Sequence, residues 1–146
     1  MRPAEVVAVV MPNRKGLVQA IKDTAKLVAP SAQADLVADQ LGSALEQLAS
    51  TWAAHVAETE APEGLLADLV TTAPRLCPAV EELRHDHGDL SERLQVLRLR
   101  VTEEKTSTTS STRWAIRDLL DQLIHHDQVG AELVWDAYNL DLGGGG

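Results

Sequence analysis

Residues 76–101 read LCPAVEELRHDHGDLSERLQVLRLRV, and this stretch carries apolar residues in a seven-residue repeat. Apolar residues that recur every three and four positions lie on one face of an α-helix, so the stretch predicts a long helix with a buried seam. His87 is the polar member of that seam. Two rows spaced by seven form it: Leu76, Leu83, Leu90 and Leu97, and Val80, His87, Leu94 and Val101.

Two further stretches repeat this pattern with a histidine in one row. Residues 112–139 contain His126, and residues 31–59 contain His55. The first pair of rows is Leu119, His126, Leu133 and Leu140 with Ile116, Leu123, Gly130 and Ala137. The second pair is Ala34, Leu41, Leu48 and His55 with Val37, Ala44, Thr51 and Glu58.

The five histidines of the chain divide into two groups by this periodicity. His85 and His125 fall on rows that also carry acidic residues, so we expect both to face solvent. His55, His87 and His126 fall on apolar rows. The sequence therefore predicts three imidazoles that point into one interior from three different helices.

Proline and glycine residues mark the ends of the predicted helices. We expect one all-α helical domain that spans residues 1–146. Residues 1–30 form an N-terminal segment, in which the apolar run Val6–Met11 is expected to be buried. The predicted segments are helices at about 15–28, 31–59, 64–72, from the prolines at 74 and 78 to Glu104, and 112–139, a solvated loop at 105–112, and a flexible tail at 143–146.

Composition and charge limit the classes of partner. The chain of 146 residues is 45% hydrophobic and has a formal net charge of −9. An acidic surface repels phosphate backbones, so nucleic acid is a poor partner. Val6–Met11 is too short to cross a membrane. Cys77 is the single cysteine, which excludes an intrachain disulfide and favours the cytoplasm, and we expect it to fill apolar space. Trp52 and Trp114 are expected in the core or at its edge.

A buried imidazole needs a hydrogen bond, a charge or a metal ion, because burial without a partner costs about 1–3 kcal/mol. Imidazole is a common ligand for iron and zinc, and helix bundles build metal sites from side chains that face inward. His55, His87 and His126 therefore allow two interpretations, a metal site or a polar network inside the core.

Nearby carboxylates bear on what such a site could bind. Glu58 follows His55 by three residues, so both side chains can face the same point. Asp127 lies on a row that flanks the seam of the last helix, from which it can reach inward or pair with a base. Glu60 is expected at the surface.

Three segments carry a family resemblance: His55-Val-Ala-Glu58-Thr-Glu60, Leu83-Arg-His-Asp-His87-Gly-Asp-Leu90, and His125-His126-Asp-Gln-Val-Gly-Ala-Glu132-Leu-Val. They resemble the histidine-bearing helices of hemerythrin-like (HHE cation-binding) proteins over about residues 31–140. The resemblance implies an antiparallel four-helix bundle, here with the short extra helix between the second and third long helices. It also implies a non-haem di-iron site with histidine and carboxylate ligands, and a role in oxygen binding, sensing or redox chemistry.

The chain departs from the family pattern at several places. Residues 1–54 contain no histidine, and Asp39-Gln40 stands where the pattern has Asp-His. Thr59 and Gly130 occupy positions that often carry a carboxylate in the family. One metal ion and two metal ions therefore remain alternatives.

The resemblance implies metal ligation by His55, His87 and His126, with Glu58 and Asp127 as carboxylate ligands or as their hydrogen-bonding partners. Iron is the expected metal, with zinc or no metal as alternatives, and dioxygen is the expected small-molecule partner. Such a protein binds or senses rather than turning over an organic substrate. The second hypothesis is a metal-free helical interaction module whose histidines form a buried network that fixes helix register.

Overall fold

The computed structural model describes residues 2–30, 34–105 and 107–143. All regular structure in these ranges is helical, so the all-α prediction is confirmed. The elements are α1 (Pro3–Val10), α2 (Arg14–Val28), α3 (Ala34–Glu60), α4 (Leu65–Thr72), a 3-10 turn (Pro74–Leu76), α5 (Cys77–Glu104) and α6 (Ser110–Gly143).

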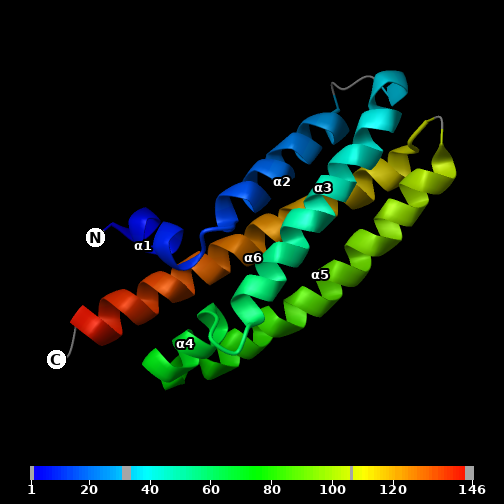
Figure 1. The fold of residues 1–146 in the computed structure, drawn as a ribbon. Coiled ribbons are helices and arrows are strands. Elements are labelled where there is room, and N and C mark those ends of the chain that lie inside the picture. The colour runs from blue at the N-terminus through cyan, green and yellow to red at the C-terminus, as the bar shows by residue number, and fades with distance from the viewer. Residues whose placement is uncertain (1, 31–33, 106, 144–146) are drawn as a thin grey trace.

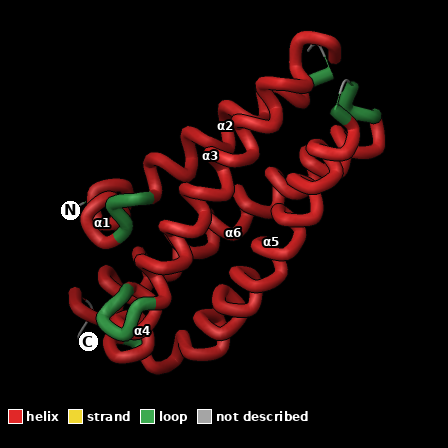
Figure 2. The backbone as a smooth tube through the Cα atoms, turned by 45° about the vertical axis from the view of Figure 1, so that its right-hand side comes forward, coloured by secondary structure: helices red, strands yellow, loops and turns green. Residues whose placement is uncertain are grey.

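The long helices α2, α3, α5 and α6 form a bundle (Figure 1). Helix α2 packs against α3 and α6, and α5 packs against the same two helices. The chain reverses direction between α2 and α3 and between α5 and α6, and both reversals lie at the same end of the bundle (Figures 1 and 2). The short helices α1 and α4 lie toward the other end, where both termini are found.

The core consists of two apolar clusters. The long-helix cluster is built from α2, α3, α5 and α6, and it includes Leu41, Leu48, Leu94, Leu97, Ile116 and Leu119. The end cluster joins the short helices to α5 and α6, and it includes Val7, Met11, Leu65, Leu66, Leu69, Val80, Leu83 and Val134. The predicted burial of the apolar run near the N-terminus is confirmed at Val7 and Met11, and most of that run belongs to α1.

The predicted seam of residues 76–101 is confirmed at all eight positions, each of which is buried; seven lie on α5 and Leu76 lies in the 3-10 turn before it. The second row predicted for α3 is wrong by one residue. Leu45, Trp52 and Thr59 are buried, whereas Ala44, Thr51 and Glu58 are only half-buried. On a helix, the row that contains Leu41 and Leu48 has one neighbouring row three residues further along and another four residues further along. Because α2 and α5 pack against α3, it is the row four residues further along that becomes buried.

The predicted solvated loop at 105–112 is also wrong in part, because α6 begins at Ser110. The buried Thr112 hydroxyl donates to the Glu104 carboxylate at 2.6 Å, and the Thr109 hydroxyl donates to the same carboxylate at 2.8 Å. These bonds tie the end of α5 to the start of α6.

Several other expectations differ from the structure. Trp114 is 63% exposed rather than packed, and Cys77 is exposed at the start of α5 rather than filling apolar space. Helix α6 continues to Gly143, beyond the predicted end at 139. The predicted starts of the second long helix at 31–33 and most of the predicted tail at 143–146 lie outside the described residues.

No helix in the described part of the chain combines the length and apolar character needed to cross a bilayer.

Candidate metal centre

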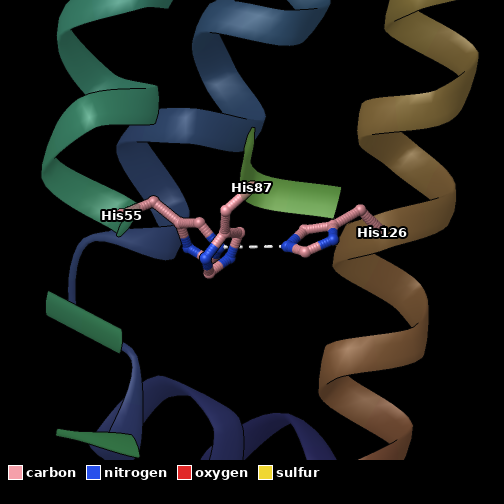
Figure 3. Close-up of side chains that lie close together, drawn as sticks. All are labelled: His55, His87 and His126. Atoms are coloured by element: carbon pink, nitrogen blue, oxygen red, sulfur yellow. Dashed lines mark hydrogen bonds between the residues drawn. The ribbon is translucent and has the colours of Figure 1, made fainter. Parts of the chain in front are cut away.

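His55 from α3, His87 from α5 and His126 from α6 converge on one point inside the bundle (Figure 3). Their exposures are 6%, 3% and 4%, and one nitrogen of each ring lies within 4.8 Å of the others. We call these three residues the histidine layer. His85 and His125 are exposed, and His85 lies 3.3 Å from Asp89 on its own helix. The predicted division of the histidines into inner and outer groups is confirmed.

The histidine layer lies where the two apolar clusters meet. Leu90 and Leu123, one turn from His87 and His126, belong to the long-helix cluster, and Leu83 on the other side of His87 belongs to the end cluster. The histidines occupy the same buried heptad positions as these leucines, so all three imidazoles lie in the core at the same height along the bundle.

Trp52 packs against all three rings. Its indole stacks on His55 with ring centroids 5.2 Å apart and an interplanar angle of 24°. It meets His87 and His126 edge-on at 5.5 Å and 5.3 Å. The indole Nε1 donates to the Ser91 hydroxyl on α5 at 2.8 Å, which fixes the orientation of the ring.

Two carboxylates outside the predicted ligand set, Asp86 and Glu60, approach two of the rings from outside. The Asp86 carboxylate lies 3.2 Å from His126 Nδ1. The Glu60 carboxylate lies 3.4 Å from His87 Nδ1, which is longer than a normal hydrogen bond. Asp86 lies seven residues before Arg93, and both side chains reach α6, but this shared direction is visible only in the structure. The sequence predicts Glu60 at the surface, with folding back as the alternative, and the structure shows both features: its side chain is 32% exposed and also approaches His87.

Burial lowers the pKa of all three histidines. The pKa of His55 falls to about 3, first because burial disfavours the charged ring and then because His126 and His87 repel a proton. Burial also lowers the pKa of His87 and His126, although Glu60 and Asp86 respectively oppose that shift. The rings are therefore neutral near pH 7, which is the protonation state that offers a nitrogen lone pair to a metal.

The predicted carboxylate candidates do not join the histidines. In the described part of the chain, the donor atoms that group within 4.8 Å belong to the three imidazoles. The Asp127 carboxylate forms a paired contact with the Arg14 guanidinium at 2.7 Å and 2.8 Å. Glu58 is half-buried, and its Oε1 is buried without a hydrogen-bond partner among the described residues. Glu58 thus keeps one oxygen available near the end of α3, whereas Asp127 is engaged.

A small cavity of about 10 Å³ adjoins the histidine layer, close to the lower limit for one water-sized particle. Leu65, Leu66 and Leu69 of α4 line it together with Met11 and Gly130. A Cβ at Gly130 would meet no heavy atom within 4 Å, so this glycine leaves space and does not serve close helix packing.

The turn before α4 brings that helix over the cavity. At Gly64 a Cβ would lie 2.5 Å from the Glu58 carbonyl oxygen, so the close approach of the chain requires glycine there. This close approach places the leucines of α4 next to the end of α3.

The donor geometry is close to that of three ligands of one tetrahedral cation. His55 Nε2 and His126 Nε2 are 3.4 Å apart, close to the edge of about 3.3 Å of a tetrahedron with metal–nitrogen bonds of about 2.0–2.1 Å. Three atoms within 4.8 Å of one another surround a point at most about 2.8 Å from each, so shifts of under about 1 Å would complete the bonds. Three neutral imidazoles suit zinc, iron, copper or nickel.

A comparison of the chain with family models, with curated proteins and with solved structures finds no match.

Proposed function

We propose that this protein is a hemerythrin-like metal-binding bundle in which His55, His87 and His126 hold a single transition-metal ion, with a role in binding or sensing oxygen or redox state. The observation that carries the proposal is the convergence of three buried, neutral imidazoles from three helices within 4.8 Å.

One ion is favoured over two because the carboxylates needed to bridge a second ion are not presented to the rings. Asp127 is held by both of its oxygens on Arg14. Among the described residues, Glu58 has an unpartnered Oε1, but this atom is not among the donor atoms that group with the three imidazoles. All three imidazoles line the small cavity, so a small molecule held there would lie beside the ion.

The order of the elements supports the hemerythrin-like arrangement. The histidines lie on the last three of the long helices, and the short α4 stands between the second and third of them. The packing of α2 against both α3 and α6 is the packing expected of the first helix in such a bundle. Iron bound at the histidines would supply redox chemistry. The chain itself would orient the ligands, exclude bulk water and admit only a small molecule, since leucines and Met11 line the adjoining cavity.

The test is to purify the protein without a histidine tag and to measure iron, zinc and manganese per chain, before and after anaerobic loading with Fe(II). We expect close to one ion per chain. Metal well below one equivalent after loading would reject the proposal.

Two matched pairs of variants locate the ligands. His87→Ala is expected to lower metal affinity by more than the about 10- to 100-fold seen for changes outside the ligand set, whereas His85→Ala on the same helix leaves it unchanged. His126→Ala and His125→Ala form the corresponding pair on α6. Equal losses within either pair would contradict the assignment.

The oxygen or redox role needs its own measurement. Admitting air to the Fe(II)-loaded protein is expected to change its visible spectrum, and the Zn(II)-loaded protein is the control. An unchanged spectrum with one bound Fe(II) would leave a metal site and remove the proposed role in oxygen binding.

The alternative function is a metal-free interaction module with a histidine network, and one contact favours it. The His55 and His126 Nε2 atoms can share a hydrogen bond across their 3.4 Å separation. That module would show no metal under any loading condition and would keep its stability when metal chelators are added.

A further inference from the structure

Asp86 is the point at which the buried histidine layer meets solvent-exposed side chains. Its side chain is 45% exposed, whereas that of His126 is only 4% exposed, and the two are joined by the 3.2 Å contact at Nδ1. Asp86 also lines a surface groove between α5 and α6 that contains His85 and His125. The Asp86 carboxylate is therefore partly exposed to solvent and also contacts a buried imidazole.

The chemistry of this contact determines which nitrogen of His126 carries the hydrogen. A neutral imidazole has one N–H donor and one nitrogen acceptor, and an ionised carboxylate can only accept. The contact with Asp86 is a hydrogen bond when Nδ1 carries the hydrogen. The lone pair then belongs to Nε2, the nitrogen that lies 3.4 Å from His55 Nε2 in the interior.

We propose that Asp86 is a positioning residue of the proposed metal site, which holds the hydrogen of His126 on Nδ1 and so turns the Nε2 lone pair toward the other two imidazoles. This inference rests on the proposed function for its purpose, although the arrangement itself exists without metal. A carboxylate behind a metal-ligating imidazole fixes the orientation of the ring and makes the nitrogen a stronger donor to the metal.

The same contact sets the state of His55 before metal binds. With a lone pair on His126 Nε2, a hydrogen bond across 3.4 Å requires the hydrogen of His55 on its own Nε2. Asp86 thereby orders two rings through one bond. The His55 ring is kept in place by its stack on Trp52.

The first experiment observes the hydrogen directly in the metal-free protein by ¹⁵N NMR of the histidine rings. We expect His126 in the Nδ1–H form in the wild type, a shift toward Nε2–H in Asp86→Ala, and retention of Nδ1–H in Asp86→Asn, whose amide oxygen still accepts. Asp89→Ala, on the exposed face of the same helix, is the matched control. An Nε2–H form in the wild type, or an unchanged His126 in Asp86→Ala, would overturn the proposal.

The second experiment measures Zn(II) affinity by competition with a chromophoric chelator. Asp86→Ala is expected to weaken binding by about 10- to 100-fold, with partial recovery in Asp86→Asn and no change in Asp89→Ala. Equal affinities for the two alanine variants would overturn the inference. If the wild type binds no zinc or iron, the proposed function fails, and the NMR measurement alone decides whether Asp86 orders the rings.

Discussion

One heptad away from the histidine layer lies a leucine layer, formed by Leu48, Leu94 and Leu119. The two layers occupy the same heptad rows on α3, α5 and α6. The leucines are 0%, 3% and 0% exposed, and the histidines are almost as deeply buried. The two layers therefore share their geometry and differ in their chemistry. Burial stabilises the leucines through the hydrophobic effect, while it removes the imidazoles from water at a cost. Stability alone would place leucine in both layers, so the histidines indicate a function.

The largest effect is expected from breaking the leucine layer. Leu119→Ala removes a fully buried side chain and should lower the free energy of unfolding by about 2–5 kcal/mol. Ile124→Ala on the same helix is the control, because Ile124 is 40% exposed and should change stability by less than about 1 kcal/mol. Urea denaturation of both variants measures the difference, and similar losses would mean that the leucine layer is not part of the core.

Acid is expected to act on the histidine layer and to leave the leucine layer untouched. The pKa of His55 is about 3 in the folded protein and about 6.5 when it is unfolded, so below pH 6.5 the unfolded state binds more protons. Stability present above pH 6.5 is then lost as the pH falls toward 3, by about 1.4 kcal/mol per unit for one such group.

Denaturation curves from pH 7 to pH 4, compared between the wild type and His55→Leu, test this slope. Losses that come from carboxylates elsewhere occur in both proteins and cancel. Parallel curves would show that His55 does not resist protonation.

A smaller effect is expected at the border of the histidine layer, where Arg14 joins α2 to Asp127 on α6. Arg14→Gln leaves the Asp127 carboxylate, which is only 10% exposed, without its partner, and should lower stability by about 1–2 kcal/mol. Lys15→Gln removes the same charge from the next, exposed position and should have little effect. Equal losses would assign the effect to net charge rather than to the pair.

The smallest expected effect has the opposite sign. His87→Leu completes the apolar row of α5 and should raise the stability of the metal-free protein by about 1 kcal/mol, because it removes the desolvation of a polar ring. The same variant should lose metal binding. His85→Leu is the exposed control. A large loss of stability in His87→Leu would instead favour a histidine network that holds the fold together.

The sequence predicts the long helices and the three inner histidines because both follow from periodicity along one helix. The sequence does not predict which second row of α3 is buried, since Thr51 and Trp52 both lie next to the row that contains Leu48 and His55. Only the packing of other helices distinguishes them.

The partners of the histidines depend on contacts between distant segments. Asp86 stands next to His87 in the sequence yet contacts His126, which lies 40 residues away. Asp127 stands next to His126 yet pairs with Arg14, which lies 113 residues away. No spacing rule within one helix reveals such pairs.

The stack of Trp52 on the histidines also gives the protein an optical probe of its own centre. Excited indole is quenched by contact with a protonated imidazole or with an open-shell ion, and this indole touches all three rings. With Trp114 and Trp135 replaced by phenylalanine, the emission would come from a single ring at the centre. Metal binding or protonation at the histidine layer would then change the fluorescence intensity of Trp52, without any attached dye.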